Sequence, residues 1–218
     1  MKNSIWICWM LLMAAGFLGC EEPAPITSNT SNDSSAMSMP MPKTSAEIEF
    51  KDDVESNVDF PASVSELEFV DTEGKKIAVA DYHNDRNIIL VFTEGFNKML
   101  CPFCKTQTSR LIANYDKFKA LDTEILVVYP GATEHLGEFI EAAKTTDKEQ
   151  VDSVPFPIVL DEDFKAVDFF DIRSKLAHPA TYLIDKSGNV VFAYVGADMT
   201  ADRPSVQAML DRLTAANK

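Results

Sequence analysis

Cysteine and histidine are both scarce in this chain. It has four cysteines and three histidines among 218 residues. Cys8 and Cys20 lie in an apolar N-terminal leader, so the folded part keeps only Cys101 and Cys104. A structural zinc site needs four ligands at matched spacings, and the three histidines are scattered along the sequence. These counts argue against structural zinc and leave one closely spaced thiol pair for chemistry.

Basic residues are outnumbered by acidic ones. The chain has 20 Lys and Arg against 34 Asp and Glu, a formal net charge of −14 at pH 7. Removal of the leader, whose only charged side chain is one lysine, leaves about −15. Nucleic acids and anionic lipids attract clustered positive charge. The composition therefore predicts no nucleic-acid partner and no electrostatic attachment to a membrane, and it favours a solvated acidic surface.

Long hydrophobic runs are absent after the first twenty residues. The one long run extends from Ile5 to Leu18 behind an early lysine, and Gly19-Cys20 follows it. This order is typical of a secretory signal peptide, here residues 1–20. Its Gly-Cys end resembles a bacterial lipoprotein leader, whose cysteine is lipidated. We predict export to the cell envelope and lipid anchoring at Cys20, facing the periplasm or exterior. Ordinary export or an uncleaved anchor is the alternative.

The rest of the chain divides into a tether and one domain. Residues 21–57 are rich in Ser, Thr, Asn, Pro and acids without periodicity, which predicts a flexible tether. Residues 58–218 are globular in pattern, with a hairpin around "DTEG", and later a second hairpin and a last helix. Between the two hairpins, short apolar runs that are typical of buried strands alternate with helical patterns. These apolar runs lie at 87–92, 124–129 and 156–160. This alternation predicts an α/β fold with helices on both faces of a mixed sheet.

The sequence "CPFC" lies between a predicted strand and a predicted helix. Pro102 suits a first helical turn. The free N–H groups and the dipole of a helix start favour a thiolate at Cys101, lowering its pKa from ~8.5 toward ~3.5–7.5. Cys104, one turn along, can attack a mixed disulfide formed at Cys101. We predict an exposed nucleophile at Cys101 and a buried resolving thiol at Cys104. A permanent disulfide is the alternative, although so small a loop stabilises little.

Several segments together resemble the redoxin branch of the thioredoxin-like superfamily, which includes AhpC/TSA domains and tethered envelope thiol-disulfide oxidoreductases. They are "NIILVF", "CPFC", "EILVVY", "FPIVLDED" and "HPATYLIDKSGNVVFAYVG", spread over about residues 58–215. The resemblance implies a three-layer sandwich with an N-terminal β-hairpin extension. It also implies that Pro179 is a cis-proline packed against the cysteines. That proline would present the main chain of residues 177–179 to a partner strand and keep metals from the thiols.

Two activities of the superfamily compete. Peroxiredoxins of this kind carry a Thr three residues before the reactive cysteine, a Pro seven before it, and an Arg just ahead of the late strand. This chain has Lys98, Glu94 and Pro179 at those positions. The missing Thr and Arg would orient and polarise a peroxide, so their absence favours disulfide exchange with protein clients over the peroxidase alternative. Arg173 replaces the missing Arg only if its loop folds back.

Three further residues are secondary candidates. Lys98 can lower a thiol pKa and Glu94 can accept a proton, although exposed loop residues are usually inert. His178 immediately precedes Pro179 and can tune the thiols, because histidine is the side chain suited to changing its charge in the physiological pH range. Copper-delivery proteins on this fold combine two cysteines with a downstream His, which makes copper binding a third hypothesis. The resemblance implies no organic cofactor, and it implies an upstream reductase and a client as partners, with the direction of electron flow open.

Overall fold

The computed structural model describes residues 44–61, 63–147 and 150–217. The predicted signal peptide, the predicted lipidation site Cys20 and the first part of the predicted tether lie outside these residues. Among the helices in the described ranges, none combines the length and the apolar character needed to cross a membrane.

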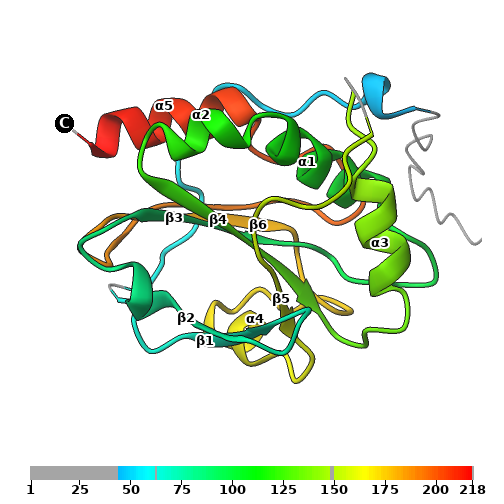
Figure 1. The fold of residues 1–218 in the computed structure, drawn as a ribbon, viewed down its shortest axis with the longest axis horizontal. Coiled ribbons are helices and arrows are strands. Elements are labelled where there is room, and N and C mark those ends of the chain that lie inside the picture. The colour runs from blue at the N-terminus through cyan, green and yellow to red at the C-terminus, as the bar shows by residue number, and fades with distance from the viewer. Residues whose placement is uncertain (1–43, 62, 148–149, 218) are drawn as a thin grey trace, which may run out of the picture. The chain divides into compact units, whose positions relative to one another are not determined.

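A seven-stranded mixed sheet forms the centre of the domain, in the order β2-β1-β5-β4-β3-β6-β7 (Figure 1). Its strands are β1 (Glu68–Asp71), β2 (Lys76–Ala78), β3 (Asn87–Phe92), β4 (Thr123–Pro130), β5 (Ile158–Asp161), β6 (Ala180–Ile184) and β7 (Val190–Val195). The central strands β3, β4 and β5 are parallel, and the hairpins β1–β2 and β6–β7 join them antiparallel on either side. Every residue of β3 and β4 is buried, as expected for apolar strands covered on both faces.

Helices cover both faces of this sheet. They are η1 (Ser45–Glu47), η2 (Val79–Tyr82), α1 (Pro102–Ala113), α2 (Tyr115–Lys119), α3 (Leu136–Ala143), α4 (Lys165–Phe169) and α5 (Val206–Ala216). One buried cluster joins side chains of α1, α2, α3 and α5 to one face of the sheet, and a second joins α4 and η2 to the other. Figure 1 shows α1, α2 and α5 on one side and α4 on the opposite side. The predicted three-layer α/β sandwich with an N-terminal hairpin is confirmed.

The packed domain begins earlier than the predicted boundary between tether and domain. Ile48 and Val54 are only 2% and 5% exposed and belong to the cluster that contains α1 and α5. Asn57 covers the outer edge of β7, where its side-chain amide both donates to and accepts from the main chain of Val195 at 2.8 Å. The polar composition of this segment conceals its few apolar anchors. We call residues 48–57 the N-terminal strap.

The fold brings three distant segments to one end of the sheet. β3 ends at Phe92, and the chain then runs through Glu94 to the start of α1. Ala180, the first residue of β6, pairs with Phe92 across the antiparallel ladder. Pro179 therefore lies at the same end of the sheet as the loop that leads to the cysteines. The loop from β7 to α5, residues 196–205, returns to this end as well.

Candidate active site

The CPFC sequence begins α1 as predicted. Cys101 is the N-cap of the helix, with extended backbone, and its Sγ accepts the N–H of Cys104 at 3.3 Å. Pro102 occupies the first turn, where a missing N–H costs nothing. Both cysteines are free thiols. The spacing therefore places two sulfur atoms together at the start of a helix.

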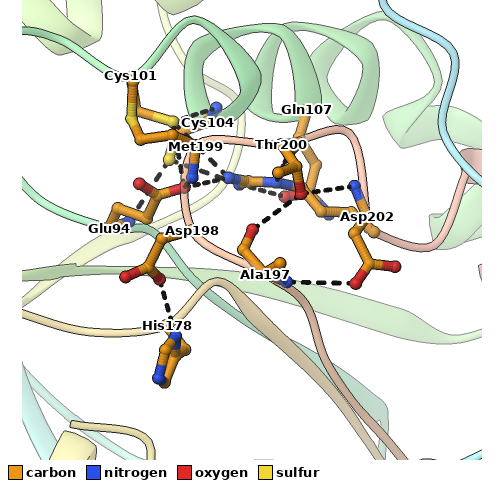
Figure 2. Close-up of polar contacts among 11 residues, drawn as sticks. Glu94, Cys101, Cys104, Gln107, His178, Ala197, Asp198, Met199, Thr200 and Asp202 are labelled. Carbon is orange, nitrogen blue, oxygen red and sulfur yellow. Dashed lines mark hydrogen bonds and ion pairs between the residues drawn. The ribbon is translucent and has the colours of Figure 1, made fainter. Parts of the chain in front are cut away.

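The prediction that Cys101 is exposed is wrong. Cys101 is 3% exposed and Cys104 is 1% exposed. The loop between β7 and α5 packs Met199 and Ala201 against the hydrophobic cluster that contains both cysteines. Figure 2 shows Met199 beside the two sulfur atoms. A helix start is commonly open to solvent, and nothing local to the motif reveals that a loop so distant in sequence covers it.

Arg203, which the sequence analysis did not single out, contacts both sulfurs and Glu94. Its side chain is almost fully buried, at 1% exposure for the residue. Nη1 donates to Cys104 Sγ at 3.4 Å, and Nη2 donates to Cys101 Sγ at 3.6 Å and to Glu94 Oε1 at 2.5 Å. Nη1 also donates to Gln107 Oε1 at 3.4 Å. The only sequence signal was an Arg before the last helix, 99 residues after Cys104.

Glu94 is the buried acceptor of this group, at 7% exposure. Its Oε1 accepts the Cys101 thiol at 3.3 Å and the Met199 N–H at 2.9 Å, in addition to Arg203. Its own N–H donates to Cys104 Sγ at 3.3 Å. Glu94 therefore touches one sulfur through its carboxylate and the other through its backbone. The expectation of an inert, exposed loop residue is therefore wrong for Glu94, and its carboxylate is placed to accept the Cys101 proton.

The pKa values of the two thiols are shifted in opposite directions. Burial, the hydrogen bond to Cys104 and the charge of Cys104 together raise the pKa of Cys101, against the effect of Arg203. Burial also disfavours the charged form of Cys104, but the hydrogen bond from Cys101 and the charge of Arg203 outweigh it and lower the pKa of Cys104. A guanidinium nitrogen and a backbone N–H donate to each sulfur, so these contacts alone do not separate the two thiols. We assign the thiolate to Cys104, because its contact with the guanidinium is the shorter one and because Cys101 Sγ donates its proton to Glu94 Oε1. The sequence predicted the thiolate at Cys101.

A pH titration of the reduced protein tests this assignment. Because the pKa of Cys104 is lowered, we expect one thiolate to persist, by ultraviolet absorbance, well below the ordinary midpoint of ~8.5. The signal should remain in Cys101→Ser and vanish in Cys104→Ser. Ionised Cys104 also contributes to the free energy of unfolding, because its pKa is lower in the folded state than in the unfolded state. This contribution should be fully present above the unfolded-state pKa of ~8.5, and it should be lost as the pH falls through the folded-state pKa of Cys104. A thiolate that survives in Cys104→Ser would contradict the assignment.

The other predicted side chains lie at different distances from this centre. Lys98 is exposed, and within the described part of the chain it makes no hydrogen bond or ion pair with a thiol. Arg173 makes two bonds to the Asp168 carboxylate, at 2.9 and 2.8 Å, so it does not replace the missing peroxiredoxin Arg. His178 Nδ1 lies 2.7 Å from Asp198 Oδ1, at the edge of the site (Figure 2).

The main chain around Pro179 is already bonded within the domain. The N–H of His178 donates to the Ile172 carbonyl, and the Pro179 carbonyl accepts the N–H of Gly196, both at 2.8 Å. Ala177 is 1% exposed. The expectation that residues 177–179 present free main-chain groups to a partner strand is therefore wrong for these groups. The loop that follows β7 packs against Pro179 and takes that place.

A cation would meet opposing charge at the thiols. Glu94, Cys101 and Cys104 place three ligand atoms within 4.8 Å of one another, and thiolates are soft ligands that suit Cu(I). However, the Arg203 guanidinium donates to all three side chains, and its positive charge opposes a metal ion there. His178, which the copper hypothesis requires, pairs with Asp198 instead. This arrangement adds no support to copper binding.

Comparisons with known proteins agree with the geometry. The model of the AhpC/TSA family matches residues 59–193. No curated protein gives a significant match. Xanthomonas campestris peroxiredoxin Q superposes with a TM-score of 0.55 at 20% identity, covering 75% of this chain and 100% of that one. Peroxidoxin BcpB from Mycobacterium tuberculosis superposes with a TM-score of 0.55 at 17% identity, covering 74% of this chain and 98% of that one. The mitochondrial 2-Cys peroxiredoxin of Plasmodium falciparum superposes with a TM-score of 0.55 at 15% identity, covering 74% of this chain and 91% of that one.

The structural similarities, at low sequence identity, concern the fold, and they confirm the predicted thioredoxin-like arrangement. The family match is stronger information, because it covers more than half of the sequence, including the strand before the cysteines, the CPFC motif, β6 and the first part of β7. It indicates thiol-dependent chemistry, of the oxidoreductase or the peroxidase kind. With two free thiols at the start of α1 and this match around them, the chain belongs to the AhpC/TSA family.

Proposed function

We propose that the protein is a thiol-dependent peroxidase that reduces small hydroperoxides, using Cys101 and Cys104 as a dithiol. The observation that carries the proposal is Arg203. In the sequence, the lack of an Arg just ahead of the late strand favours disulfide exchange over peroxide reduction. A buried guanidinium that donates to both sulfurs, at 3.4 and 3.6 Å, supplies such a group from a different loop. The burial of both sulfurs also favours a small oxidant over a folded client.

In the first step Cys101 reacts with the peroxide. Its sulfur attacks one peroxide oxygen, so that an S–O bond forms while the O–O bond breaks. The Cys101 proton passes to Glu94, whose Oε1 lies 3.3 Å away, and from there to the departing oxygen. Arg203 stabilises the negative charge that develops on that oxygen. The products are a sulfenic acid at Cys101 and an alcohol, or water when the substrate is hydrogen peroxide.

In the second step the Cys104 thiolate attacks the Cys101 sulfur. An S–S bond forms, the S–O bond breaks, and the departing hydroxide takes a proton from solvent to become water. One hydroperoxide and two thiols thus give one disulfide, one alcohol and one water. A dithiol donor then reduces the disulfide by exchange. The lowered pKa of Cys104 serves this step, because the resolving sulfur is already ionised.

The N-terminal leader indicates where the proposed peroxidase would act in the cell. The apolar run that ends in Gly19-Cys20 supports a lipid-anchored enzyme in the bacterial envelope, facing the periplasm or exterior. The thiol donor would then be a protein or small thiol of that compartment. Mass spectrometry of the membrane-bound chain tests the anchor: an N-terminal peptide that begins at Cys20 and carries acyl chains would support it, and an intact leader would contradict it.

Disulfide exchange with protein clients is the second candidate. The CPFC spacing at a helix start favours it, because Cys104 is placed to resolve a mixed disulfide at Cys101. A client would have to reach a sulfur that is 3% exposed. It would also find the main-chain groups of His178 and Pro179 engaged within the domain.

Stopped-flow oxidation of the reduced chain separates the two candidates. We expect hydrogen peroxide to oxidise the dithiol with a second-order rate constant about 10²-fold or more above that for a protein disulfide, since Arg203 and Glu94 act on the peroxide. The double variant Cys101→Ser/Cys104→Ser gives the background. A protein disulfide that reacts faster than peroxide would make exchange the function.

A further inference from the structure

The N-terminal strap meets the redox centre through the backbone of Arg203. The N–H of Lys51 donates to the Arg203 carbonyl at 2.9 Å, and the N–H of Ser205 donates to the Lys51 carbonyl at 2.8 Å. Lys51 thereby forms an isolated parallel bridge with Pro204. These bonds hold the backbone of Arg203 from one side, while its side chain reaches the sulfurs on the other.

Asp202, the neighbour of Arg203, is held by three donors. Lys51 Nζ lies 2.5 Å from Asp202 Oδ1, and the Tyr194 hydroxyl donates to the same oxygen at 2.6 Å. The N–H of Ala197 donates to Oδ2 at 3.2 Å. Lys51 Nζ also donates to the Tyr194 hydroxyl at 2.9 Å, which closes the group. Burial opposes ionisation, but the hydrogen bonds from Lys51 and Tyr194 lower the pKa of Asp202, so it remains a carboxylate.

The loop that carries Arg203 is tightly packed against itself. A Cβ added at Gly196 would lie 1.9 Å from the Asp202 carbonyl oxygen, so the two ends of the loop pack directly on each other. Figure 2 shows Ala197, Thr200 and Asp202 linked by hydrogen bonds in this compact turn. In such tight packing a displacement of one residue moves its neighbours. A movement of Asp202 would therefore change the position of the Arg203 guanidinium.

We propose that Lys51 is a positioning residue for Arg203. Through Asp202 and the main-chain bridge, the strap sets the distance between the guanidinium and the Cys104 sulfur, and so the reactivity of the thiol pair. The segment that leads toward the predicted anchor is then part of the reactive unit and not a spacer. The expected effect on the reaction rate rests on the proposed function, whereas the expected effect on the thiolate does not.

A Lys51→Met variant of the full chain tests this inference. Methionine keeps most of the apolar stem and removes the ammonium. We expect the titration midpoint of the Cys104 thiolate to rise toward the ordinary thiol value and the rate constant with hydrogen peroxide to fall about tenfold, as for a displaced catalytic group. Asp202→Asn, which keeps the shape and removes the charge, should change both readouts in the same direction.

A matched control is available at the opposite end of β6. Lys186 Nζ forms a tertiary ion pair with Asp122 at 2.8 Å, outside the site, and the lysine side chain is 38% exposed against 52% for Lys51. Lys186→Met should leave the thiolate midpoint and the rate unchanged. An unchanged midpoint in both Lys51→Met and Asp202→Asn, with only the thermal midpoint lowered, would overturn the inference. A shifted midpoint in a protein that reacts no faster with peroxide than with a protein disulfide would support the positioning role and reject the peroxidase.

Discussion

Replacement of Cys101 by serine should abolish the reaction with hydroperoxide, whereas Cys104→Ser should still consume one equivalent. Serine at 101 is a far weaker nucleophile in the same place, so we expect the rate constant to fall by about 10³-fold or more, as when other catalytic nucleophiles are removed. In Cys104→Ser the first step is intact and the second is blocked. A sulfenic acid should therefore accumulate at Cys101, seen as one added oxygen by mass spectrometry.

Two comparisons show which cysteine reacts with the peroxide: the double variant and the site of oxidation in Cys101→Ser. Cys101→Ser/Cys104→Ser reports any oxidation elsewhere in the chain, including at methionine. The specific competitor is Cys104, because its pKa is the one that is lowered and a thiolate is the better nucleophile. If Cys101→Ser is oxidised at the parent rate and the added oxygen lies on Cys104, the two roles are exchanged. Glu94 would then have no part in the first proton transfer.

The fold could be predicted because its signals are local. The runs "NIILVF" and "EILVVY" became β3 and β4, in which every residue is buried. Continuous apolar strands that alternate with amphipathic helices leave few arrangements other than a sheet covered on both faces. The Cys-Pro pair likewise marked the start of α1, because an N-cap followed by proline is a local preference.

The site could be predicted only in part, because its charges come from distant segments. Glu94 is a candidate from the sequence because it closely precedes the motif, but nothing local to it predicts its burial. Arg203 lies 99 residues beyond Cys104, and in the sequence it looks like any surface arginine ahead of a helix. Lys98 is closer in sequence but lies in an exposed turn with left-handed backbone, φ 65°. Nearness in sequence does not determine which charge the fold buries.

Replacement of Arg203 by glutamine should reduce both stability and activity. The change removes the charge that pairs with Glu94 at 2.5 Å in a nearly solvent-free position. Loss of one partner from a buried ion pair typically costs about 3–5 kcal/mol, because the other charge is left uncompensated. In a domain of this size that corresponds to a fall in thermal midpoint of roughly 10 °C. Arg173→Gln, which breaks an exposed pair with Asp168, should cost ~1 kcal/mol or less.

Kinetics of Arg203→Gln, measured well below its thermal midpoint, separate the chemical role from the structural one. Without the guanidinium, the Cys104 thiolate loses a charged donor and the departing peroxide oxygen loses its stabilising group. We expect the thiolate midpoint to rise and the peroxide rate constant to fall about 10²- to 10³-fold, as for the loss of a preorganised oxyanion donor. A rate within about twofold of the parent protein, in a variant that has lost stability, would reduce Arg203 to a buried structural charge. The main reason to prefer peroxide reduction over disulfide exchange would then be gone.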